Sequence, residues 1–115
     1  MWGMYTLVGH EPEPCTDSIE WAVWFGTADR HVAHNQPLPD VSISTVFLGL
    51  DHRFSDKGPP LLFETMIFGG KHDGWQERCS TWDQAVAMHA RAVNMVQETA
   101  SSPAKRKKKI DEESS

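Results

Sequence analysis

The chain has 115 residues and a mass of 13.0 kDa, which suits one domain and is too small for two independent cores. Hydrophobic residues make up 39% and charged residues 23%, a composition that excludes a disordered or collagen-like polymer. No apolar run approaches the roughly 20 residues of a membrane span, and the N-terminus lacks a signal-peptide pattern. We therefore expect a cytoplasmic protein with no membrane association.

The formal net charge of -5 weighs against general nucleic-acid binding, because attraction to phosphate needs positive charge. Five of the 11 lysine and arginine residues lie together near the C-terminus. If the protein binds nucleic acid or an acidic partner, we expect this cluster to make the contact. This basic cluster consists of Lys105, Arg106, Lys107, Lys108 and Lys109. We predict one folded domain over residues 1–98 and a disordered, solvated tail over residues 99–115. Residues 1–100 alone then carry a charge of -7.

The first third of the chain predicts a strand, a helix and an edge strand. Alternation over residues 4–8 predicts a short strand, and the turn-rich residues 9–14 end it. Asp17 and Glu20 have the spacing of a capping box, which predicts a helix through about Asp29. Residues 31–35 fit a weak edge strand before a linker at residues 37–39.

Residues 41–50 and 61–68 are rich in β-branched and large apolar residues and predict an antiparallel hairpin around the loop 51–60. If the pairing is symmetric about this loop, Phe47 faces Glu64. One face of the hairpin, expected to carry the helices, then collects Ser44, Val46, Leu48, Leu50, Leu61, Phe63, Thr65 and Ile67. The other face collects Ile43, Thr45, Phe47, Gly49, Leu62, Glu64, Met66 and Phe68.

A further strand is expected over residues 75–80, followed by a capped helix. The cap is either Thr81 with Gln84 or Ser80 with Asp83. This order predicts an α+β fold, a two-layer sandwich with an antiparallel sheet of about four strands and two helices on one face. His89 completes the apolar stripe of the last helix, where we expect a hydrogen-bonded histidine at the edge of the core.

Five polar residues near the hairpin have side chains suited to chemistry: Asp51, His52, Glu64, His72 and Asp73. Together they would supply the oxygen and nitrogen ligands of a divalent metal. The turns at residues 51–52 and 72–73 should, however, lie at opposite ends of a strand over 20 Å long, at about 3.3 Å per residue. We therefore predict neither a metal site nor a cofactor.

Glu64 interrupts an apolar strand and needs a partner, for which Arg53, Arg78, Lys71 and the Thr45 hydroxyl are the candidates. The alternative is that the face of Glu64, Phe47, Met66 and Phe68 binds a ligand, a protein partner or a second copy. A homodimer through this face is the hypothesis that follows. The free thiol of Cys79, just before a helix cap, is expected to be buried and inert.

Three segments carry a resemblance: STVFLGLDH at 44–52, PPLLFETMIFGG at 59–70, and STW at 80–82 with His89 downstream. They resemble a family of small uncharacterised proteins of tailed bacteriophages and prophages. The likeness covers about residues 5–96. The family pattern has an aromatic residue at position 79 and a glycine before the histidine, where this chain has Cys79 and Met88. The resemblance implies a phage accessory protein in the bacterial cytoplasm and transfers no catalytic residue.

Two functional hypotheses follow from these observations. The first is a non-enzymatic phage protein that binds a host or defence component, or itself, through the Glu64 face and the loop 51–60. The second is a small-ligand or metal-binding enzyme with a site around Asp51, His52 and Glu64. The binding residues expected overall are Asp51, His52, Glu64, Phe47, Met66 and Phe68, and no residue is expected to be catalytic.

Overall fold

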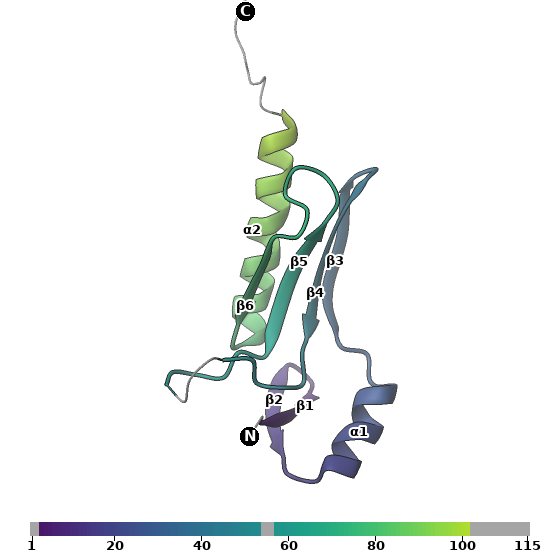
Figure 1. The fold of residues 1–115 in the computed structure, drawn as a ribbon, viewed down its shortest axis with the longest axis vertical. Helices are drawn as coiled ribbons and strands as arrows, with labels where there is room; N and C mark the ends of the chain where they lie inside the picture. Colours follow the sequence, from purple (N-terminus) through teal and green to yellow (C-terminus); the bar gives the residue numbers. More distant parts are fainter. Residues whose placement is uncertain (1–2, 54–56, 102–115) are drawn as a thin grey trace, which may run out of the picture.

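The computed structural model describes residues 3–53 and 57–101, which form an α+β fold with two antiparallel sheets (Figure 1). The first sheet is a hairpin of two strands, and the second has four strands in the order β3-β4-β5-β6. In chain order the elements are β1 (Met4–Val8), β2 (Glu11–Cys15), α1 (Ser18–Thr27), β3 (His31–Leu38), β4 (Val41–Phe47), β5 (Phe63–Phe68), β6 (Gln76–Cys79) and α2 (Trp82–Ser101). The predicted class and the four-stranded antiparallel sheet are confirmed. The basic cluster at residues 105–109 lies outside the described residues.

Strand β2 replaces the turn expected over residues 9–14. It pairs antiparallel with β1, and only Gly9 and His10 form the turn between them. Pro12 and Pro14 made a strand unexpected here, because a proline lacks the N–H that a central strand needs. A two-stranded sheet consists of edges only, so the prolines are tolerated here.

Helix α1 begins where the sequence predicts. The Asp17 carboxylate accepts hydrogen bonds from the backbone N–H groups of Ile19 and Glu20, at 2.9 and 3.1 Å. The helix packs on β1 and β2 and lies at one end of the molecule, beyond the end of the four-stranded sheet (Figure 1). The prediction that two helices share one face of the sheet is therefore wrong, because the hairpin β1–β2 takes α1 as its own partner.

Aromatic side chains attach α1 to the rest of the molecule. The Trp21 indole Nε1 donates to the backbone oxygens of Tyr5 and Gly49, at 3.0 and 3.2 Å. Gly49 has φ +80°, and a Cβ at this position would lie 3.1 Å from the Phe25 ring. Trp24 and Phe47 form a T-shaped pair, with ring centroids 5.9 Å apart and an interplanar angle of 85°. The inner face of α1 is thus aromatic.

The register of β4 and β5 differs by one residue from the symmetric pairing. Phe47 faces Phe63, and Val46 faces Glu64. Because side chains alternate between the two faces of a sheet, this slip moves every β4 residue to the opposite face. Phe47 is fully buried, so its prediction as a surface binding residue is wrong.

Helix α2 covers one face of the four-stranded sheet and packs on all four of its strands. Its predicted capping box is confirmed, since Thr81 Oγ1 accepts from the Gln84 N–H and Gln84 Oε1 accepts from the Thr81 N–H, at 3.1 and 3.2 Å. The helix extends to Ser101, three residues beyond the predicted domain end at residue 98.

The core under α2 has two apolar clusters with a polar layer between them. One cluster is built on Val41, Ile43, Ile67, Ala92 and Val96, and the other on Phe47, Leu62, Phe63 and Ala85. Between them lie three buried polar side chains, Thr45, Thr65 and His89. The opposite, open face of the sheet carries Ser42, Ser44 and Val46 from β4, with Glu64, Met66 and Phe68 from β5.

Candidate functional site

Asp51 organises the loop that follows β4. Its Oδ1 accepts hydrogen bonds from the backbone N–H groups of Arg53 and Leu61, both at 3.0 Å, and its Oδ2 lies 2.6 Å from the Arg53 Nε. Burial raises the pKa of the Asp51 carboxyl, but these two hydrogen bonds and the Arg53 charge outweigh it, so the pKa lies below the usual value. Both carboxylate oxygens are therefore engaged in closing the loop.

His52 belongs to the same loop closure. Its Nδ1 lies 2.8 Å from the backbone oxygen of Leu50, and its backbone N–H donates to the Leu61 oxygen at 3.0 Å. Asp51 and His52 lie beside Leu61, before β5, whereas Asp73 accepts from the Gly69 N–H after β5 at 2.6 Å. The two turns thus lie at opposite ends of β5, as the sequence predicts. Within residues 3–53 and 57–101, no group of three or more His, Cys, Asp or Glu side chains is placed to hold a metal ion.

Glu64 is paired across the sheet with Arg78, one of the predicted partners. The Arg78 Nε donates to Glu64 Oε2 at 3.0 Å, and the two residues face each other in the register of β5 and β6. Met66 and Phe68 lie on the same open face, with Phe68 47% exposed. The predicted set is thus divided: Glu64, Met66 and Phe68 share the open face, Asp51 and His52 close a loop, and Phe47 is in the core.

The open face is more polar than the sequence suggests. Ser42 and Ser44 stand where the symmetric register would place Ile43 and Thr45. The area available for an apolar contact, including a homodimer, is correspondingly smaller.

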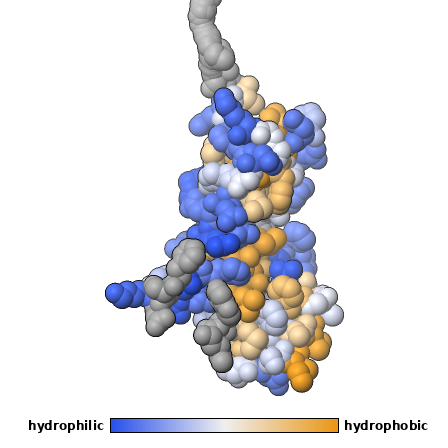
Figure 2. Space-filling model, viewed as in Figure 1, coloured by the Kyte–Doolittle hydropathy of each residue, from blue (hydrophilic) through white to orange (hydrophobic). Residues whose placement is uncertain are grey.

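The outer face of α1 is apolar instead. None of the helix residues is buried, and Ile19 and Val23 are 77% and 64% exposed. Residues four apart in a helix share a face, so these two side chains are neighbours, with the small Ala22 and Gly26 beside them. We call Ile19, Ala22, Val23 and Gly26 the α1 patch. Figure 2 shows hydrophobic residues at the lower right of the molecule, where Figure 1 places α1.

The unit that carries the α1 patch is strongly acidic. Residues 3–29 contain no lysine or arginine, and they hold five carboxylates: Glu11, Glu13, Asp17, Glu20 and Asp29. The next residue, Arg30, is turned away from this surface, because its guanidinium lies 3.9 Å over the Phe25 ring and donates to the Phe47 backbone oxygen. With Arg30 included, residues 3–30 still carry a formal net charge of -4, from five carboxylates and one arginine.

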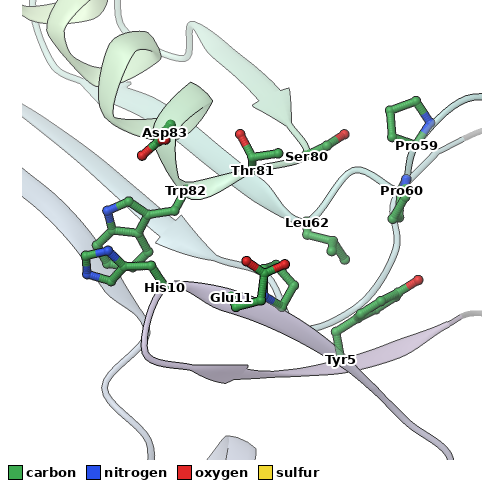
Figure 3. A pocket seen from close by; sticks show the side chains of 11 residues that line it. Tyr5, His10, Glu11, Pro59, Pro60, Leu62, Ser80, Thr81, Trp82 and Asp83 are labelled. Carbon is green, nitrogen blue, oxygen red and sulfur yellow. The ribbon is translucent and has the colours of Figure 1, made fainter.

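A pocket of about 410 Å³ lies between the hairpin β1–β2, residues 59–62 and the start of α2 (Figure 3). The His10 ring stacks on Trp82, with ring centroids 3.7 Å apart and an interplanar angle of 4°, and so ties the hairpin to α2. We call this cavity the Trp82 pocket. Its lining residues are Tyr5, His10, Glu11, Pro12, Pro59, Pro60, Leu62, Ser80, Thr81, Trp82 and Asp83. The sequence gives no sign of this pocket, because three segments that are distant in the chain build it. Of the regions proposed for binding from the sequence, the loop 51–60 contributes two lining residues, Pro59 and Pro60.

Cys79 and His89 do not form a nucleophile and base. The Cys79 thiol donates to the Thr81 backbone oxygen, and burial is the main cause that raises the pKa of this thiol. The ring nitrogens of His89 are bonded to Thr45 and Asn35 instead. His89 has the hydrogen-bonded structural role predicted for it, whereas Cys79 is only partly buried and not fully buried as predicted.

Comparisons with protein-family models, curated proteins and solved structures found no match to this chain. Among the described helices, none combines the length and hydrophobicity that crossing a membrane requires.

Proposed function

We propose that this protein is a non-enzymatic binding protein that docks a positively charged protein on the α1 patch. The observation that carries the proposal is the exposure of Ile19 and Val23 from one face of a helix that buries none of its residues. Single apolar residues are common on protein surfaces, whereas apolar side chains gathered on one helix face mark an interaction surface. Burial of both side chains would supply several kcal/mol, at about 1.5–3 kcal/mol each.

The charge of the partner follows from the acidic unit around the patch. With five carboxylates and no lysine or arginine in residues 3–29, this end of the molecule attracts cations and repels anions. A partner with an apolar centre and a basic rim satisfies both features. A second copy of this chain would instead place like charges against each other, so the α1 patch does not favour self-association.

The resemblance to phage proteins supports a bacterial host or defence protein as this partner. The open sheet face with Glu64, Met66 and Phe68 offers a smaller apolar area, and Glu64 is paired with Arg78. The enzymatic alternative around Asp51 has less support, because loop hydrogen bonds engage both oxygens of this carboxylate.

Affinity capture from a bacterial extract, quantified by mass spectrometry, tests the proposal. The bait is the full chain, its Ile19→Ser, Val23→Ser double variant, or the control Val86→Ser. Val86 is 48% exposed on α2, so the control removes an exposed aliphatic side chain elsewhere. We expect a basic protein whose recovery falls at least about tenfold with the double variant and not with the control. Equal recovery with all three baits, or an acidic partner, would contradict the proposal.

A further inference from the structure

We propose that the Trp82 pocket is a second binding site, one that takes the guanidinium of an arginine from a basic protein segment. This inference goes beyond the docking surface of the proposed function, because it concerns different residues and a different kind of contact. It depends on the shape of the pocket, the sign of its charge and the chemistry of its walls.

The pocket has the size and construction of a ligand site. Its volume of about 410 Å³ falls within the range of small-molecule and side-chain sites. The stacked His10 and Trp82 rings form one wall, and Tyr5 lies on the other side with Pro60 and Leu62 nearby (Figure 3). The walls belong to elements that are anchored separately, since the hairpin pairs with Leu50 through Met4 and α2 packs on the sheet.

The charge of the lining residues is negative. Glu11 and Asp83 are the two carboxylate residues of the pocket, and its lining includes no lysine or arginine. Figure 3 shows the Glu11 carboxylate in the space between Trp82 and Tyr5. Within residues 3–53 and 57–101, neither carboxylate has a hydrogen bond or an ion pair to another side chain. Both are therefore available to a cationic ligand.

An anionic ligand would need the N-terminus of α2, where free backbone N–H groups attract negative charge. The capping interactions engage one of these groups, the N–H of Gln84, together with the two N–H groups that precede the helix. Gln84 Oε1 accepts from the N–H groups of Ser80 and Thr81, at 3.1 and 3.2 Å, and Thr81 Oγ1 accepts from the Gln84 N–H. With two carboxylates and no lysine or arginine in its lining, the pocket favours a cation over an anion.

The aromatic and proline walls favour arginine among the cations. A guanidinium is planar, stacks on the face of a tyrosine or tryptophan ring, and can donate to a carboxylate with two N–H groups at once. The prolines and Leu62 offer apolar contact to the methylene groups of the same side chain. The compact, strongly hydrated ammonium of lysine uses fewer of these features.

The arginine could come from another protein or from this protein's own basic cluster. Helix α2 has 20 residues, so at about 1.5 Å per residue it places the pocket about 30 Å from the C-terminal end of the helix. The five further residues from Ser101 to Arg106 span at most about 18 Å. Arg106 therefore cannot reach the pocket of its own molecule, and the basic cluster would have to come from a second copy.

Calorimetric titration of the full chain with a short acetylated peptide that contains three arginines tests the inference. The matched peptides carry citrulline, which keeps the shape and loses the charge, or glutamate. The protein variants are Glu11→Gln and Asp83→Asn, with Glu20→Gln as the control. This control removes the same charge from α1, outside the pocket. Thermal unfolding of each variant shows that it is folded.

We expect the arginine peptide to bind and the citrulline and glutamate peptides not to bind. Glu11→Gln and Asp83→Asn should each weaken binding by about two- to fivefold, and Glu20→Gln by less than about twofold. Equal affinity of Glu11→Gln and the unchanged protein, or binding of the citrulline peptide, would overturn the inference. Replacement of all five basic residues at 105–109 by glutamine identifies the source. Tighter peptide binding then shows that the cluster of a second copy competes for the pocket, and unchanged binding shows an arginine from another protein.

Discussion

The Thr45 Oγ1 lies 2.7 Å from the Nδ1 of His89, inside the interface between the sheet and α2. The Nε2 of His89 lies 2.7 Å from the Oδ1 of Asn35, and Thr45 is also bonded to Thr65 on the neighbouring strand. Because the Asn35 Oδ1 can only accept, Nε2 carries the proton and Nδ1 accepts from the Thr45 hydroxyl. Both ring nitrogens are thus satisfied in the neutral form of a buried histidine.

The stability of the protein should therefore fall in mild acid. Burial is the main cause that lowers the pKa of His89 in the folded state, and the charge of His34 adds to it. Below the ordinary histidine pKa of about 6.5, the unfolded chain binds a proton that the folded protein resists, so acid favours unfolding. We expect the unfolding temperature to decrease as the pH falls from 7.5 to 5.5. The variant His89→Gln should show a smaller decrease, and an equal decrease in both proteins would contradict this assignment.

The register of β4 and β5 predicts a sharp contrast between adjacent residues. Phe47 is fully buried and its ring centroid lies 5.3 Å from that of Phe63, whereas Val46 lies on the open face. Phe47→Ala should lower the free energy of unfolding by about 3–5 kcal/mol. Val46→Ala should lower it by less than about 1 kcal/mol. Urea denaturation measures both, and a larger loss for Val46→Ala would support the symmetric register.

Gly69 should tolerate no side chain. Its φ is +90°, and a Cβ would lie 2.0 Å from the backbone oxygen of Asp40, which cannot move without disturbing the turn between β3 and β4. Gly58 has a similar φ of +79° with nothing within 4 Å of its Cβ position, so Gly58→Ala should cost only about 1–2 kcal/mol of backbone strain. Gly69→Ala should cost clearly more in the same chemical denaturation experiment. Equal costs would show that the close approach to Asp40 is unimportant.

Asp51 should contribute to stability through the loop that it closes. Asp51→Ala leaves the N–H groups of Arg53 and Leu61 without their acceptor and should cost about 1–3 kcal/mol. Because the pKa of the carboxyl is lowered in the folded state, its contribution is present above the unfolded pKa of about 3.9 and is lost as the pH falls through the folded value.

The exposed Asp40 provides the comparison, since Asp40→Ala removes a carboxylate of the neighbouring turn at little cost. Thermal unfolding of both variants at pH 7 and pH 3 gives the measurement. If Asp51→Ala were as stable as Asp40→Ala at pH 7, the hydrogen bonds of Asp51 would not stabilise the loop, and the enzymatic hypothesis around Asp51 would gain support.

Local patterns predicted much of this fold from the amino-acid sequence alone. The cap at Asp17, the reciprocal cap of Thr81 and Gln84, and the β-branched run of β4 depend on neighbours within a few residues. An unpaired carboxylate in an apolar strand is energetically costly, which correctly indicated that Glu64 has a partner. Arg78 was among the partners predicted. Each of these features is decided by interactions that the sequence displays directly.

The tertiary structure alone decided which face of β4 is buried and where the largest surface features lie. Side chains alternate between the two faces of a strand, so a difference of one residue in the pairing places Val46, and not Phe47, on the open face. The Trp82 pocket was likewise decided by tertiary structure, because His10 stacks on Trp82, a residue 72 positions further along the chain. Long-range packing has no local signal, whereas caps, alternation and charge do, and this difference separates what the sequence determined from what required the fold.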